Sequence, residues 1–118
     1  MRKKMKICIE NEDTVFIKNN CIEIHTESED YCFDGSEIQE INIITSAMGP
    51  FYDDMCLAIE IGKGEPAVVF IMSEHPLYSS LLFDGLKQLV ELNYKAVIEA
   101  SSCTEEKLFP IYRREAEV

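Results

Sequence analysis

Apolar and polar positions alternate with a period of two through the first half of the chain, and this period is typical of strands that are buried on one face. Ile22 and Ile24, for example, alternate with Glu23 and His25. Turn-forming residues, of which Asp34-Gly35 is the clearest pair, separate one such run from the next. The pattern predicts strands over residues 6–10, 14–18, 21–26, 31–33 and 41–45.

The most apolar runs lie in the middle of the chain and predict the centre of a sheet. Apolar residues alternate again in Met55–Ile61, whereas Ala67–Ile71 contains no polar residue, which predicts a strand covered on both faces. Two glycines between these runs suit a tight turn. Ahead of them, Ser36 and Gln39 have the spacing of a capping box, so we expect one helical turn over Glu37–Glu40.

After the second of these strands the period changes to three or four, which predicts a helix. Residues 73–76, with a proline in the first turn, form its start, and Asn93 suits a left-handed cap at its end. We expect a second short helix over Tyr94–Ala100 and a final strand over Lys107–Arg114, where Pro110 favours an edge position. The apolar stripe of the first helix comprises Leu77, Leu81, Leu82, Leu86, Leu89 and Val90.

These elements predict an α+β fold, in which an antiparallel sheet of about five to seven strands is packed by one main helix in the C-terminal half. The chain has 118 residues and 47% hydrophobic content. This is enough for a single domain over residues 1–118, which buries about two-thirds of the surface that the unfolded chain exposes. The apolar content also argues against disorder, despite a formal net charge of −11.

Negative charge is concentrated between Glu10 and Glu60, where thirteen carboxylates accompany one basic residue, Lys18. Crowded like charges destabilise a fold, but a field of one sign attracts an oppositely charged partner. The pattern therefore favours binding to a basic protein, and solubility alone is the competing interpretation. The carboxylates are those of Glu10, Glu12, Asp13, Glu23, Glu27, Glu29, Asp30, Asp34, Glu37, Glu40, Asp53, Asp54 and Glu60.

The same charge pattern disfavours nucleic acid as a ligand, because binding to its backbone needs clustered Lys and Arg. The one such cluster is Arg2-Lys3-Lys4 with Lys6. The apolar stretch that follows is too short, and too soon interrupted by Glu10, for a signal peptide. The longest apolar run, Ala67–Met72, is too short to cross a bilayer. We therefore expect a cytoplasmic protein that does not bind membranes.

Residues with catalytic or metal-binding potential are scattered along the chain. His25 and His75 have no Cys or His partner at the short spacings of zinc sites, so we expect neither a metal nor another cofactor. A Cys103 nucleophile with His75 as its base is the enzymatic alternative, but a short chain contains such a pair by chance, and we predict that the protein is not an enzyme. Five cysteines, mostly within apolar strand patterns, indicate a reducing compartment and a role as small core residues.

Residues 46–54 form the first irregular stretch with unusual content. Gly49-Pro50 interrupts the backbone, and Phe51-Tyr52 places two aromatic rings beside Asp53-Asp54. Loops of this composition often bind a partner. The alternative is that one ring packs under the sheet while the aspartates face water.

This loop is part of a pattern that covers roughly the last two-thirds of the chain and resembles a family of small acidic bacterial proteins of largely unassigned function. The pattern comprises Gly49-Pro50-Phe51 with Asp53-Asp54, an apolar strand, the leucine-rich helix, and Asn93–Ala100 with Ser102 and Phe109. Such proteins are similar to immunity proteins of contact-dependent and polymorphic toxin systems, which bind and block a basic nuclease toxin. The segment Ser36–Ile41 also resembles the entry to a central strand in pleckstrin-homology-like sheets.

The leading hypothesis is a non-catalytic binding protein whose acidic surface occludes a basic partner, and the resemblance implies that this partner is a toxin domain. Aromatic anchors usually supply most of the energy of an interface, whereas charges steer the encounter. The alternative is a regulatory or scaffold module of pleckstrin-homology type that binds a peptide or forms a homo-oligomer through a sheet edge. The expected partner-binding residues are Glu27, Glu29, Asp30, Tyr31, Phe51, Tyr52, Asp53 and Asp54.

Overall fold

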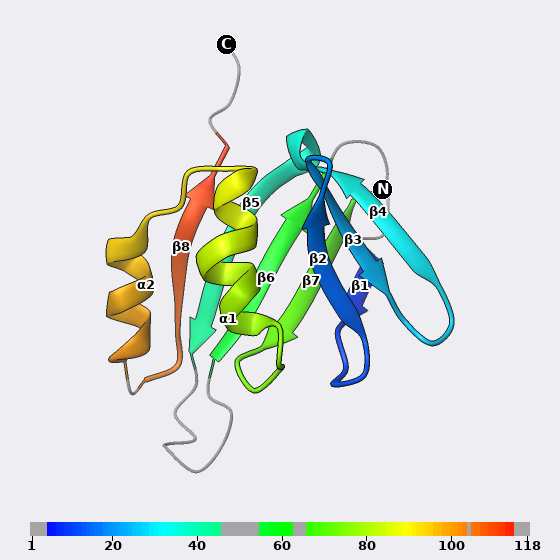
Figure 1. Ribbon diagram of the computed structural model, residues 1–118. Coiled ribbons are helices and arrows are strands. Elements are labelled where there is room, and N and C mark those ends of the chain that lie inside the picture. Colours follow the sequence, from blue (N-terminus) through cyan, green and yellow to red (C-terminus); the bar gives the residue numbers. More distant parts are fainter. Residues whose placement is uncertain (1–4, 46–54, 63–65, 104, 115–118) are drawn as a thin grey trace.

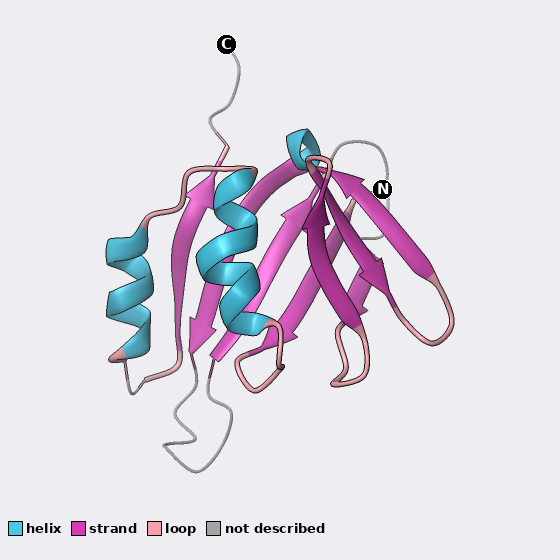
Figure 2. Cartoon of the chain, viewed as in Figure 1, coloured by secondary structure: helices cyan, strands magenta, loops and turns pink. Residues whose placement is uncertain are grey.

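The computed structural model describes residues 5–45, 55–62, 66–103 and 105–114. Within these residues the fold is α+β, as predicted, and its eight strands form two sheets rather than one. In Figure 1 and Figure 2, the smaller sheet and the helices lie on the same face of the larger sheet. The hydrophobic core lies between these two layers.

The smaller sheet has three antiparallel strands in the order β2-β3-β4. β2 (Thr14–Lys18) and β3 (Cys21–His25) are joined by a two-residue turn, in which Asn19 and Asn20 have φ angles of 52° and 62°. Asparagine tolerates this left-handed conformation, and two such residues in succession match the twist of a tight hairpin. β4 (Asp30–Asp34) completes the sheet beside β3.

The larger sheet has five strands in the order β1-β7-β6-β5-β8. All neighbouring strands are antiparallel except β1 and β7, which are parallel. A parallel pair needs a long crossover. Here the chain between β1 and β7 first forms the three strands of the smaller sheet and then β5 and β6 of the larger sheet. The strands are β1 (Met5–Cys8), β5 (Ile38–Thr45), β6 (Met55–Ile61), β7 (Ala67–Met72) and β8 (Lys107–Arg113).

The central strand β6 shows the alternation that the sequence predicts. Leu57, Ile59 and Ile61 are at most 1% exposed and belong to the core. Glu60 points to the opposite face and is half-buried. In β7 the predicted covering of both faces is incomplete, because Phe70 is only half-buried.

The helical segment after β7 is shorter and less regular than predicted. It consists of α1 (Tyr78–Ser80), the π-helical turn η2 (Leu81–Gly85) and the 3-10 turn η3 (Leu86–Gln88), which follow one another as one coil in Figure 1. Gly85 allows this coil to approach β2 closely, since a Cβ atom there would lie 2.9 Å from the Ile17 side chain. Among the described residues, no helix has the length and apolar content needed to cross a bilayer.

Asn93 begins a helix instead of ending one, so its predicted role as a left-handed cap is wrong. Its φ angle is −86°, and its side chain accepts a hydrogen bond from the Ala96 N–H at 3.2 Å. This contact satisfies one of the unpaired N–H groups in the first turn of α2 (Tyr94–Ser101). The second helix expected from the sequence is thereby confirmed.

The helical turn expected over Glu37–Glu40 lies earlier in the chain, as η1 (Gly35–Glu37). The Asp34 side chain caps this turn by accepting a hydrogen bond from the Ser36 N–H at 2.8 Å. The capping-box interpretation of Ser36 is therefore wrong, because the aspartate two residues before it provides the cap.

β8 lies beside β5 at one edge of the larger sheet, so the edge position predicted for Pro110 is confirmed. Pro110 is paired with Asn42, and the register shifts next to this pair, between Ile41 and Asn42. Proline cannot donate to a strand ladder, and an edge strand needs to pair on one side only.

None of the five cysteines is buried, so their predicted role as core residues is wrong. The strand period explains this result. In β3, Ile22 and Ile24 take the core positions, so Cys21 faces outward. All five are free thiols: Cys8 and Cys32 are exposed, and Cys21, Cys56 and Cys103 are partly exposed.

Candidate partner-binding face

The outward-facing side chains of the smaller sheet form one surface, which we call the outer face. Because side chains alternate along a strand, Val15, Ile22 and Ile24 point into the core and are at most 2% exposed, while their neighbours point outward. Strand pairing arranges these neighbours in three rows: Thr14, His25 and Asp30; Phe16, Glu23 and Cys32; and Lys18, Cys21 and Asp34.

His25 contacts side chains from all three strands of the outer face. Its Nδ1 atom lies 3.0 Å from Asp30 Oδ1, and its Nε2 atom lies 3.5 Å from Glu23 Oε1. The imidazole also stacks on the ring of Phe16, with 5.4 Å between centroids and 25° between the ring planes. The outer face therefore has two stacked rings held beside two carboxylates.

Phe16 is a candidate aromatic anchor that the sequence did not lead us to expect. It is 40% exposed on the edge strand β2, although it is a large apolar residue. The sequence does contain a signal for its exposure. Val15 and Ile17 take the core positions of this strand, so Phe16, which lies between them, faces outward with the polar residues. Aromatic side chains are enriched in protein interfaces.

Acidic residues dominate the outer face. The face carries one basic side chain, that of Lys18, in addition to His25, and three carboxylates, those of Glu23, Asp30 and Asp34. Asp30 and Asp34 are exposed and Glu23 is partly buried. Three carboxylates and one lysine therefore share the outer face with the exposed ring of Phe16.

The loop between β3 and β4 extends this acidic surface. The Thr26 hydroxyl donates to the Glu29 backbone oxygen at 2.8 Å and accepts from the Glu29 N–H at 3.0 Å, which closes the loop tightly. Glu27 is exposed inside this loop, as is Glu29 at its end. Three of the predicted binding residues, Glu27, Glu29 and Asp30, therefore lie at one edge of the outer face.

Tyr31 lies on the opposite side of β4 from the outer face. It packs against the core and stacks on Phe33, with 6.1 Å between ring centroids. A hydrogen bond to the Glu29 carboxylate, together with partial burial, raises the pKa of Tyr31. Tyr31 also lines a pocket of about 450 Å³ with Glu10 and Glu27. The structure therefore places Tyr31 beside acidic residues, but Phe16 is the aromatic ring that the outer face exposes.

The other four predicted binding residues, Phe51, Tyr52, Asp53 and Asp54, lie outside the described residues, as does Gly49-Pro50.

The outer face carries two thiols, those of Cys21 and Cys32. Partial burial, the neighbouring Cys32 thiol and the Asp34 and Glu23 carboxylates raise the pKa of the Cys21 thiol. A thiol that stays protonated is a weak nucleophile. Within the described part of the chain, no group of three or more His, Cys, Asp and Glu residues is placed to hold a metal ion.

His75 and Cys103, the residues of the enzymatic alternative, have different partners. His75 is 4% exposed, and its Nε2 atom lies 3.0 Å from the backbone oxygens of both Glu10 and Asp13. The Cys103 sulfur lies 3.7 Å from the Thr45 hydroxyl oxygen. Each residue therefore contacts a segment that is distant from it in sequence.

No protein-family model, curated protein or solved structure matches this chain.

Proposed function

We propose that this protein is a non-catalytic binding protein that docks a basic protein on the outer face. We further propose that the partner is the nuclease domain of a toxin, and that docking blocks its active or nucleic-acid-binding surface. The observation that carries this proposal is the exposed ring of Phe16, stacked on His25 among Glu23, Asp30 and Asp34.

The two kinds of residue on the outer face have different roles in binding. Lys and Arg side chains of a basic partner are attracted to the carboxylates over a distance of about 10 Å at moderate salt, which accelerates the encounter. The Phe16 ring then loses water against the partner and supplies the short-range energy, as aromatic residues do at the centre of an interface. Glu27 and Glu29 add charge at the rim.

The contacts of the nucleophile candidates support the non-catalytic part of the proposal. Both ring nitrogens of His75 are engaged, since Nδ1 also accepts a hydrogen bond from the Leu77 N–H at 3.0 Å. The raised pKa of Cys21 disfavours the thiolate form of that residue. Neither group is arranged as a base beside a nucleophile.

The proposal predicts that a secreted protein with a basic C-terminal domain is encoded next to this chain, and that domain is the partner to test. Co-expression of the chain should protect a host cell from that domain, and the purified pair should associate faster at low salt than at physiological salt. Replacing Phe16 with Ala should weaken binding by about 1–3 kcal/mol, as expected for a central aromatic anchor. The double change Glu23→Lys with Asp30→Lys should mainly slow association.

The matched control is Glu99→Lys, which alters charge at an exposed position of α2, on the side of the molecule away from β4 (Figure 1). It should leave protection and association nearly unchanged. Binding that ignores salt, Phe16→Ala and the charge reversals alike would refute the docking site. A neighbouring basic domain that kills cells whether or not this chain is present would refute the immunity function.

A different surface favours the alternative, a regulatory or scaffold module of pleckstrin-homology type that pairs with a second copy. On the face of the larger sheet opposite the core, Met72 and Leu108 are 40% and 49% exposed. The strand register places Cys56 and Ile44 between them in one apolar row. Such a row is self-complementary across a two-fold axis, where it meets its own copy.

Light scattering after size-exclusion chromatography separates the two functions. A dimer that forms without any basic partner and becomes a monomer on Leu108→Glu would support the alternative. A monomer at about 100 μM, a concentration well above most functional dissociation constants, would remove it.

A further inference from the structure

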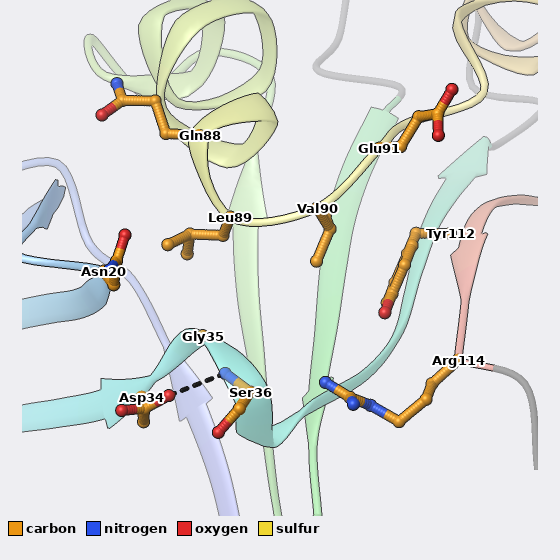
Figure 3. A pocket seen from close by; sticks show the side chains of 10 residues that line it. All are labelled: Asn20, Asp34, Gly35, Ser36, Gln88, Leu89, Val90, Glu91, Tyr112 and Arg114. Carbon is orange, nitrogen blue, oxygen red and sulfur yellow. Dashed lines mark hydrogen bonds between the residues drawn. The ribbon is translucent and has the colours of Figure 1, made fainter. Parts of the chain in front are cut away.

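We propose that a second surface, the pocket shown in Figure 3, binds a small monocarboxylate with an apolar body. The pocket has a volume of about 540 Å³, which is within the range of small-molecule sites. The β2–β3 turn and η1 form one side of the pocket. The end of the helical coil and the end of β8 form the other side. This inference goes beyond the proposed function and uses a different set of residues, with Asp34 as the one that both share.

Arg114 supplies the group that would bind the carboxylate. Its backbone N–H donates to the Gln39 oxygen at 2.8 Å, and its Nε–H donates to the Ile38 oxygen at 2.9 Å. Both contacts fix the side chain against β5. Figure 3 shows the guanidinium directed into the pocket. Within the described part of the chain, no hydrogen bond or ion pair engages its Nη groups, and a guanidinium presents such groups as a planar fork that matches a carboxylate.

The lining of the pocket is mostly polar, and its apolar part would hold the apolar body of the ligand. Leu89 and Val90, both half-buried, line it together with the half-buried ring of Tyr112. The pocket is also preformed on this side, because η1 packs closely on Leu89: a Cβ atom on Gly35 would lie 3.0 Å from the Leu89 Cδ2 atom. A rigid site loses less entropy on binding than one that must first order itself.

The charges around the pocket select a carboxylate over a phosphate. Asp34 and Glu91 line the pocket with Arg114, and the whole chain carries a formal net charge of −11. Two neighbouring carboxylates and this field repel a dianion more strongly than a monoanion. A ligand with one negative charge gains the contact with Arg114 at the smaller cost in repulsion.

Titration of the ¹⁵N-labelled protein followed by NMR tests the proposal, with 3-phenylpropionate, benzoate, acetate and inorganic phosphate as probes. The two aromatic acids should saturate in the low millimolar range or below and shift the amides around Arg114, Val90 and Ser36. Acetate should bind more weakly because it lacks the apolar body. Phosphate binding as tight as that of the aromatic acids would overturn the assignment, as would no saturable binding up to roughly 10 mM, the range of very weak ligands.

Neighbouring arginines provide a matched pair of variants. Arg114→Gln should weaken binding about tenfold or more, since it removes a charge-assisted hydrogen bond. Arg113→Gln should have no effect, because Arg113 pairs with Glu40 rather than lining the pocket. Ser36→Glu leaves Arg114 in place and adds a negative charge to the pocket, so it should also weaken binding. Equal affinity in all three variants would refute the site. A further variant separates the two proposals, because Phe16→Ala should change partner docking without changing carboxylate binding.

Discussion

The Nε2 atom of His75 lies 3.0 Å from the backbone oxygen of Asp13, so the segment between β7 and the helical coil is tied to the turn between β1 and β2. The Glu10 oxygen lies at the same distance from Nε2. Carbonyl oxygens only accept hydrogen bonds, so Nε2 must carry the proton, and Nδ1 is then free to accept from the Leu77 N–H at 3.0 Å. His75 therefore acts as a neutral, buried connector between two distant parts of the chain.

Replacing His75 with Ala should lower the free energy of unfolding by about 2–4 kcal/mol. The change leaves a cavity and removes the hydrogen bonds that the imidazole makes to the backbone groups of Glu10, Asp13 and Leu77. Urea denaturation followed by circular dichroism measures it. His25→Ala is the control, because His25 is largely exposed and its change should stay within about 0.5 kcal/mol. Equal losses in the two variants would contradict the connector role of His75.

Gly35 should tolerate no larger residue, because η1 packs directly on the β2–β3 turn and on the end of the helical coil. A Cβ atom there would lie 3.0 Å from Leu89 Cδ2 and 3.1 Å from the Asn20 backbone oxygen. Gly35→Ala should therefore cost about 1–3 kcal/mol of unfolding free energy, the usual range for overpacking.

Gly62→Ala is the matched control for this prediction. A Cβ atom at Gly62 would lie 2.9 Å from Gln39 Cγ, which belongs to a flexible side chain that can move aside. Its thermal unfolding midpoint should stay close to that of the unmodified protein, while that of Gly35→Ala falls. A Gly35→Ala protein as stable as the Gly62→Ala protein would show that the turn can move away from Leu89.

The Glu40–Arg113 pair should make stability depend on pH in the acidic range. Arg113 Nη2 lies 2.7 Å from Glu40 Oε1, and this contact holds the pKa of Glu40 below its ordinary value. A carboxyl whose pKa is lower in the folded state contributes stability that is fully present above its unfolded pKa of about 4.3, and that is lost as the pH falls through the folded pKa.

Arg113 is mostly exposed, so solvent limits the contribution of this pair to about 0.2–1 kcal/mol. Glu40→Gln should reduce the difference in unfolding free energy between pH 7 and pH 3 by that amount. Chemical denaturation at both pH values measures it, with Glu99→Gln on α2 as a control that should not change the difference. A Glu40→Gln protein with an unaltered pH dependence would contradict the prediction.

Thr45 should be sensitive to loss of its hydroxyl, although Val has nearly the same shape. Thr45 is buried at the end of β5, where its hydroxyl donates to the Glu105 backbone oxygen and accepts from the Lys107 N–H at 3.1 Å. Thr45→Val should cost about 1–3 kcal/mol, because these backbone groups lose their partner. Thr14→Val, at an exposed position of β2, should be nearly neutral. Hydrogen exchange at the Lys107 amide should also accelerate in Thr45→Val alone.

Local patterns were sufficient to predict most individual elements. The alternation in Cys21–His25 and Met55–Ile61 predicted both strands and the side that each one buries, since a strand has two faces and only one is apolar. The edge position of Pro110 followed from its missing N–H. The helix after β7 was predicted from its leucine spacing, but its early end at Gln88 and the capping role of Asn93 depend on how the chain turns toward β8.

The candidate sites also depended partly on the sequence and partly on the tertiary structure. Sequence alone established an excess of carboxylates, their concentration in the first half of the chain and the apolar period of each strand, because these are properties of neighbouring residues. Tertiary structure decided that β1 pairs in parallel with β7, that Phe16 stacks on His25 from another strand, and that Arg114 lines a pocket with η1 while Arg113 pairs with Glu40. The stacking of Phe16 on His25 depends on the pairing of one hairpin. The other contacts join residues that are distant in sequence, and the strand pairing that brings them together is fixed only when the whole core packs.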